Sequence, residues 1–145
     1  MKTTKTAKTM KTTKTLATCL LLLMTTSVAL AGKEEREYVK TDVTPAVKAA
    51  EAAYKQSCGC ALKIVINVKT MNELYQAKYT AEGISNAVAG YCNDDESKKA
   101  VCQLKTLEIT KGKETGFTFK GGKGTAATNG KTYVNWEQIT HELDK

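Results

Sequence analysis

The chain has 145 residues, and its 22 Lys and Arg against 15 Asp and Glu give a formal net charge of +7. Five of these lysines and none of the acids lie in residues 1–31, which leaves 17 basic against 15 acidic side chains, or +2, in the rest. Residues 32–145 contain no cluster of Lys and Arg interleaved with aromatic residues, so composition and charge argue against a nucleic-acid-binding protein.

Residues 1–31 have the layout of a cleaved signal peptide. Residues 2–15 are a basic Lys-Thr repeat, residues 16–30 are mostly apolar, and the segment ends at Ala31 in a small-x-small pattern. The apolar run is shorter than the roughly 20 residues that a membrane-spanning helix needs. The sequence therefore predicts export to the periplasm or the cell exterior, with no stable membrane insertion after cleavage.

A lipid anchor at Cys19 is the alternative to simple cleavage. The residues before Cys19 resemble a lipid-attachment motif only weakly, because Thr18 is a poor residue in front of a modified cysteine. The apolar run also continues past Cys19. Cleavage after Ala31 is the preferred interpretation.

The first predicted elements after the leader are a helix and a strand. Residues 32–43 are highly charged and are predicted to be a flexible N-terminus, followed by a single domain over 44–145. Thr44 is a suitable N-cap and Pro45 suits a first turn, which predicts a helix over 45–56. Apolar and polar residues alternate from Leu62 to Val68, the pattern of a strand with one buried face.

A long helix and a short one are predicted next. Thr70 is the expected cap of a helix over 71–91, whose apolar stripe consists of Met71, Leu74, Ala77, Ala81, Ile84, Val88 and Tyr91. The acidic run Asp94–Glu96 favours the start of a short helix over 97–102. At 1.5 Å per residue the long helix spans about 30 Å, enough to return the chain to the level where the first strand began.

The last third of the chain has the pattern of strands. Segments 104–110, 116–120 and 131–135 are predicted to be strands, with a long loop over 121–130. Asn135 is expected to cap a C-terminal helix, with Gln138 in the capping-box position. The predicted fold is a small two-layer α+β domain with a mixed or antiparallel sheet of about four strands. Helices cover one face, and a right-handed crossover joins the first two strands.

Four cysteines remain after the leader, and an even number in an exported chain predicts two disulfides. The lengths of the strand and the long helix bring Cys58, Cys60, Cys92 and Cys102 to one end of the molecule. Because a Cys58–Cys60 bond would close a strained small ring, the preferred pairing is Cys60–Cys92 with Cys58–Cys102. The alternatives are a four-thiolate zinc site and a Cys-Gly-Cys redox centre, both disfavoured by residue spacing.

The glycine-rich segment is a candidate contact loop. It resembles a phosphate-binding P-loop, but five residues separate Gly124 from Gly130 where that motif has four, and the following residues have the pattern of a strand. It is therefore predicted to be a flexible hairpin loop that can contact a partner. The contact residues proposed are Gly121, Gly122, Lys123, Gly124, Asn129 and Gly130.

No catalytic set is evident in the sequence. His141 is the only histidine, and its place near the end of the last helix suits the helix dipole. The acidic run Asp94–Glu96 is better explained as a helix cap than as a glycosidase or calcium site. The aromatic residues Tyr91, Phe117, Phe119, Tyr133 and Trp136 are assigned to the core rather than to a contact surface.

These patterns favour a non-catalytic exported protein that binds another protein, of the inhibitor or immunity type. No cofactor, metal or nucleic acid is expected, and the partner is a protein that the sequence does not identify. The alternative is a small exported enzyme or thiol-redox factor that uses Cys58 and Cys60.

Overall fold

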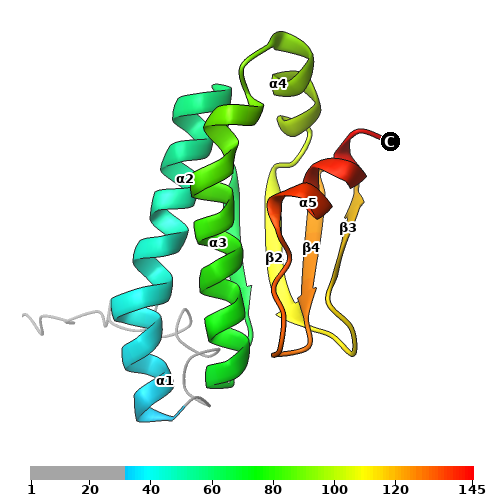
Figure 1. Ribbon diagram of the computed structural model, residues 1–145. Coiled ribbons are helices and arrows are strands. Elements are labelled where there is room, and N and C mark those ends of the chain that lie inside the picture. The colour runs from blue at the N-terminus through cyan, green and yellow to red at the C-terminus, as the bar shows by residue number, and fades with distance from the viewer. Residues whose placement is uncertain (1–31) are drawn as a thin grey trace, which may run out of the picture.

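The computed structural model describes residues 32–145, and the predicted signal peptide lies outside the described residues. The helices pack against a sheet formed by the strands, which gives two layers (Figure 1). Their order along the chain is α1 (Lys33–Tyr38), η1 (Val39–Val43), α2 (Thr44–Cys58), β1 (Lys63–Asn67), α3 (Met71–Tyr91), α4 (Asp95–Val101), β2 (Thr106–Lys111), β3 (Gly116–Lys120), β4 (Lys123–Thr128) and α5 (Trp136–Leu143).

The first helical segment corrects the prediction of a flexible terminus over 32–43. Residues 33–43 are helical, and one π-helical turn joins α1 to α2. Val43 in this turn is 1% exposed. Helix α2 also continues past the predicted end at residue 56 to Cys58, where Gly59 (φ 75°) terminates it in the left-handed conformation.

The four strands form one mixed sheet, in agreement with the prediction of a mixed or antiparallel sheet of about four strands. Their order in the sheet is β1-β2-β4-β3. The crossover from β1 through α3 to β2 joins parallel strands, and β2 and β4 are also parallel. Only β3 and β4 pair in antiparallel fashion, through a two-residue turn at Gly121 (φ 57°) and Gly122 (φ 83°). Positive φ at both positions is the type I′ geometry that closes tight hairpins.

The position of the fourth strand was predicted wrongly. Residues 131–135 contain no strand, and β4 instead lies within the segment that was expected to be a loop. Composition is the reason, because Gly124, Ala126 and Ala127 are poor strand formers by propensity. Here small residues are needed, since the Phe117 and Leu104 side chains occupy the space above Gly124. Tertiary packing therefore overrides the local preference.

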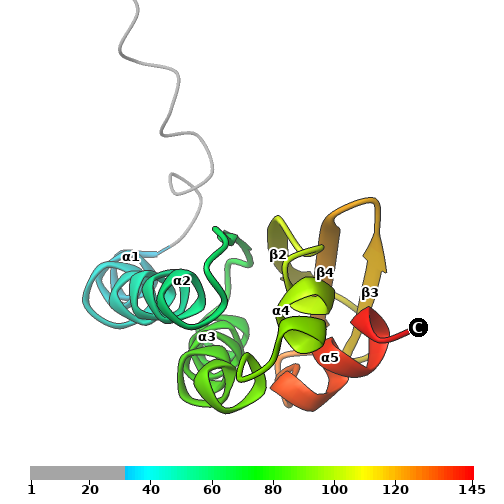
Figure 2. The same ribbon diagram turned by 90° about the horizontal axis from the view of Figure 1, so that it is seen from above.

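Helices α3 and α5 lie on the same side of the sheet (Figure 2), and α2 packs lengthwise against α3. The register places alternate side chains in rows across the covered face: Ile64, Leu107, Gly124 and Phe119 in one row, and Ile66, Ile109, Ala126 and Phe117 in the next. Among residues 32–145 no helix covers the opposite face, which carries polar side chains such as Asn67, Glu108 and Thr118.

Glu73 anchors the start of α3 to the sheet. Its carboxylate accepts hydrogen bonds from the backbone N–H groups of Lys69 and Thr70, the latter completing the capping box with the Thr70 side chain, and pairs with Lys111 Nζ at 3.2 Å. Burial alone would raise the pKa of Glu73, but these hydrogen bonds lower it below its usual value. The buried carboxylate therefore stays ionised and ties α3 to the end of β2.

Gly124 is the most sensitive glycine of the sheet. A Cβ atom there would lie 2.6 Å from Phe117 Cε2 and 2.7 Å from Leu104 Cδ1. We expect Gly124→Ala to lower the free energy of unfolding by about 1–3 kcal/mol in urea denaturation, the usual cost of overpacking a core.

Gly83→Ala is the matched control for this substitution. Gly83 lies inside α3, and a Cβ atom there would meet nothing within 4 Å. The free energy of unfolding of this variant should be higher by about 0.5–1 kcal/mol, because alanine is the better helix former. An unchanged stability in Gly124→Ala would contradict the close packing described above.

Candidate functional site

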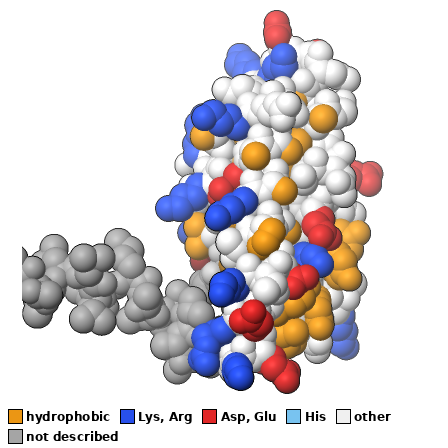
Figure 3. Space-filling model, turned by 90° about the vertical axis from the view of Figure 1, so that its left-hand side faces the viewer, with side chains coloured by type: hydrophobic (Ala, Val, Ile, Leu, Met, Phe, Trp, Pro, Cys, Tyr) orange, Lys and Arg blue, Asp and Glu red, His pale blue; other side chains and the backbone are white. Residues whose placement is uncertain are grey.

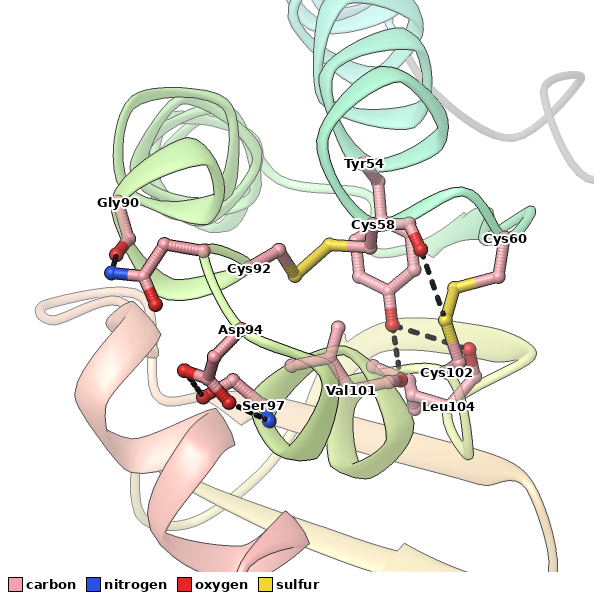
Figure 4. The surroundings of a disulfide bond; sticks show 11 residues. Tyr54, Cys58, Cys60, Gly90, Cys92, Asp94, Ser97, Val101, Cys102 and Leu104 are labelled. Carbon is pink, nitrogen blue, oxygen red and sulfur yellow. Dashed lines mark hydrogen bonds between the residues drawn. A yellow bond between two sulfur atoms is a disulfide. The ribbon is translucent and has the colours of Figure 1, made fainter.

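The four cysteines meet at one end of the molecule as two disulfides (Figure 4). They join Cys58 to Cys92 and Cys60 to Cys102, with Cα–Cα distances of 5.2 and 5.8 Å. The predicted convergence of all four is correct, whereas the preferred pairing of Cys60 with Cys92 and Cys58 with Cys102 is wrong.

The length of α2 explains the error. Because α2 runs through Cys58, this residue ends level with Cys92, which follows the last residue of the neighbouring helix α3. Gly59 then turns the chain, and Cys60 lies beyond α2 next to Cys102 at the end of α4. The bonds close loops of 34 and 42 residues, each worth about 4 kcal/mol in the chain-entropy model.

The pairing also bears on the alternative functions of the Cys-Gly-Cys segment. A redox centre of this type would alternate between two thiols and a Cys58–Cys60 bond, but the two residues are bonded to different partners. The same bonds occupy the four sulfurs that a zinc site would need. In residues 32–145 no group of three or more His, Cys, Asp and Glu is placed to hold a metal ion.

Tyr54 of α2 holds α4 in place on the buried side of the disulfide-bonded end. The Tyr54 hydroxyl is fully buried and donates a hydrogen bond to the carbonyl oxygen of Val101, with the Leu104 carbonyl oxygen 3.4 Å away (Figure 4). Both carbonyls lie at the end of α4, where i+4 helical partners are lacking. The Val101 carbonyl also accepts a hydrogen bond of 2.9 Å from the Leu104 N–H. Burial raises the pKa of Tyr54 well above its ordinary value of 10.0.

The structure separates the residues of the proposed contact loop. Gly121 and Gly122 form the hairpin turn, Lys123 and Gly124 belong to β4, and the segment is not the long loop that was predicted. Lys123 pairs with Glu108 on the uncovered face of the sheet.

Asn129 and Gly130 lie at the far end of β4, in a turn before α5. There the Asn129 side chain accepts hydrogen bonds from the N–H groups of Lys131 and Thr132. Because Gly121 and Gly130 lie at opposite ends of β4, the six residues do not form one surface.

The remaining candidates have structural roles. Asp94 caps α4 by accepting from the N–H of Ser97 at 2.8 Å, and His141 is exposed in the last turn of α5. Phe117 is buried, and Tyr91, Phe119 and Trp136 are partly buried against the core. These aromatic assignments are correct, but the assignment of Tyr133 is wrong because it is 44% exposed.

Tyr133 belongs to a row of four tyrosines on the outer side of α1 and α3, which we call the tyrosine surface: Tyr38, Tyr75, Tyr79 and Tyr133. The rings of Tyr38 and Tyr75 make an edge-to-face contact at 4.8 Å, and those of Tyr79 and Tyr133 lie 5.8 Å apart. Tyr75 and Tyr79 are on successive turns of α3, so the two pairs are neighbours. Figure 3 shows hydrophobic side chains gathered in this region, at the lower right.

A salt-bridged lysine borders the tyrosine surface. Lys78 Nζ lies 5.9 Å from the centre of the Tyr38 ring and pairs with Asp42 at 3.3 Å and Glu82 at 3.7 Å. Beyond Lys78, a groove of about 370 Å³ runs between α2 and α3 and is lined by Pro45 and Ser85 among others. Exposed aromatic rings beside a polar groove are a common composition of protein–protein interfaces.

Sequence analysis missed three of these four tyrosines. Tyr38 lay in the segment predicted to be flexible, and Tyr75 and Tyr79 were not considered. Their spacing was the available signal, since Tyr75 and Tyr79 are one turn apart and outside the apolar stripe that starts at Met71. Two large aromatic residues on the exposed side of an amphipathic helix indicate a contact surface.

A hollow of about 730 Å³ lies between α4 and α5. Four of its polar residues are engaged with one another: the Tyr91 hydroxyl lies 2.8 Å from both carboxylate oxygens of Asp144, and Asp94 accepts from Ser97. Burial, followed by this contact with Asp144, raises the pKa of Tyr91 to about 12. The remaining polar lining of the hollow consists of Glu96, Lys99, Gln103 and Lys145.

Comparisons with known proteins leave the site to be interpreted from its own geometry. The chain matches no protein-family model, no curated protein and no solved structure. Within residues 32–145, every helix is too short or too polar to cross a membrane.

The two disulfides should differ in their sensitivity to reductant. Cys58 and Cys92 are 6% and 5% exposed, whereas Cys60 and Cys102 are only partly buried. Under limiting phosphine followed by alkylation, mass spectrometry should find label on Cys60 and Cys102 before Cys58 and Cys92, because exchange depends on access. Simultaneous labelling of all four would show that reduction requires global unfolding.

Burial of Tyr54 makes stability depend on pH in the alkaline range. Its pKa is raised in the folded state, so the unfolded chain loses this proton first, and the free energy of unfolding should fall as pH rises above about 10. We expect Tyr54→Phe to lower the free energy of unfolding by about 1–3 kcal/mol at neutral pH. In urea titrations, the free energy of unfolding of this variant should decline less between pH 9.5 and 11 than that of the original protein. An identical decline in both proteins would assign the effect to other groups.

Proposed function

We propose that this protein is exported and acts without catalysis, by binding another protein through the tyrosine surface. The observation that carries the proposal is the exposure of Tyr75 and Tyr79, at 39% and 47%, in contact with Tyr38 and Tyr133. Tyrosine supplies a large and rigid contact area with few rotatable bonds, and it is enriched where proteins bind one another.

The disulfides support this proposal through rigidity and compartment. They cross-link the ends of α2, α3 and α4, and α3 is the helix that carries Tyr75 and Tyr79, so the framework that presents these two rings is covalently braced. Disulfides are also typical of proteins outside the cytoplasm, in agreement with the predicted signal peptide. An inhibitor or an immunity-type protein would act in this way, by occupying a partner's surface.

The redox alternative has less support. It depended on Cys58 and Cys60 acting together, and each is instead bonded to a cysteine that follows a helix. No specific feature of the described residues favours an enzyme over a binding protein.

Site-specific crosslinking tests the proposal. Replacing Tyr75 with the photoreactive benzoylphenylalanine in producing cells should give one dominant crosslinked partner on illumination. Adding Tyr79→Ala should reduce that yield at least tenfold, because central aromatic residues dominate interface energies. The same photoreactive residue at Val65, which is 37% exposed on the uncovered sheet face, is the matched control and should not capture this partner.

Stability measurements separate loss of binding from loss of fold. Tyr79→Ala should change the free energy of unfolding by less than about 1 kcal/mol, since Tyr79 is 47% exposed and lies outside the core. Equal crosslinking from positions 75 and 65, or a yield unaffected by Tyr79→Ala, would contradict the proposal.

A further inference from the structure

The two edges of the sheet are protected differently. At the β1 edge, the Glu51 carboxylate of α2 accepts a hydrogen bond of 2.7 Å from the backbone N–H of Ile64. At the other edge, β3 pairs with β4 on one side only. Among residues 32–145 nothing bonds to the outer side of β3, so this strand presents free backbone groups.

The hairpin register identifies these groups. A two-residue turn makes Lys120 and Lys123 a hydrogen-bonded pair, and so Thr118 and Gly116 also bond toward β4. The bonds between β4 and β2 agree with this parity, since the Gly122 and Thr128 carbonyls face β2. The N–H and C=O groups of Phe117 and Phe119 therefore point away from the sheet, toward the open edge.

A groove runs alongside these free groups. It has a volume of about 310 Å³, and β3 and α5 form its walls through Phe117, Glu137, Gln138, His141 and Glu142. Phe117 is the apolar residue of the lining, and the α5 side contributes two acids, Glu137 and Glu142, beside Gln138 and His141. Glu142 is paired with Lys145, whereas Glu137 is exposed and forms no ion pair within the described chain.

We propose that β3 and this groove bind an extended segment of another protein, which adds to the sheet as a fifth strand and places a Lys or Arg side chain in the groove. A residue opposite Phe117 would exchange backbone hydrogen bonds with it and extend the row formed by Ile109, Ala126 and Phe117. The methylene groups of its side chain would lie against Phe117, and its charge would face Glu137.

A second copy of this chain fits the edge less well. Pairing β3 with β3 of another copy would place the two α5 helices side by side on the same face of the joined sheet. The two Glu137 side chains would then face one another, and like charges at close range oppose association. An extended basic segment brings the opposite charge, and the proposal commits to that occupant.

This edge is separate from the tyrosine surface, and the inference does not depend on the function proposed above. Tyr75 and Tyr79 lie on α3, whereas the groove is formed by α5 and β3. Variants at one surface can therefore be scored without altering the other.

Selection from a displayed library of random seven-residue peptides on the oxidised protein tests the inference. The enriched peptides should alternate apolar or β-branched with polar residues and carry Lys or Arg at a fixed position. Glu137→Lys should lower the affinity for the best synthetic peptide at least tenfold, as measured by fluorescence anisotropy. Replacing the peptide's basic residue with Glu should lower the affinity by a similar factor.

Glu34→Lys is the matched control, because Glu34 is also an exposed acid in the first turn of a helix. It should change affinity less than twofold. Loss of binding in Glu34→Lys or Tyr79→Ala but not in Glu137→Lys would move the peptide to the tyrosine surface and overturn the inference. A library without enriched basic, alternating peptides would overturn it as well.

Amide hydrogen exchange resolved by residue gives the signature of strand addition. In the free protein, the amides of Phe117 and Phe119 should exchange faster than that of Thr118, which is bonded to β4. The bound peptide should slow Phe117 and Phe119 and leave Thr118 nearly unchanged. Protection that appears without peptide as protein concentration rises would identify a second copy as the occupant and overturn the proposal.

Discussion

The bond between Cys58 and Cys92 is the constraint on which the rest of the structure depends. It fastens the last residue of α2 to the residue after α3, and the two longest helices of the described chain lie side by side. With their ends fixed, Glu51 of α2 comes beside β1 and protects that edge of the sheet. The second disulfide then attaches α4, and through it the start of β2, to the same end.

Hydrophobic periodicity and capping residues were sufficient to predict the helices and strands that are specified by signals within their own segment. The bounds of α3 and β3, and the caps of α3 and α5, agree with the structure because stripes and capping boxes are local signals. Strand β4 could not be predicted in this way. Gly124 is in a strand only because Phe117 and Leu104 require a residue without a side chain there, and both are brought to it by the fold.

In the candidate site, too, local sequence signals could be read in advance, whereas features that depend on the fold could not. Cysteine spacing and element lengths predicted that the four sulfurs would meet, but the pairing depended on whether α2 ended at residue 56 or at Cys58, a difference of half a turn. Of the tyrosine surface only the spacing of Tyr75 and Tyr79 could be read locally. The contribution of Tyr38 depends on a helix over residues that are highly charged, and their helicity comes from continuity with α2.

The buried Glu73 has a consequence for where ligands can bind. Open sheets with parallel strands bind anions at the carboxyl ends of those strands, where the following helix begins, and β1, β2 and β4 all end at this level. In this chain the helix's own carboxylate takes the place of a phosphate and is neutralised by Lys111. An anionic ligand at this position would therefore meet a carboxylate that already occupies the start of α3.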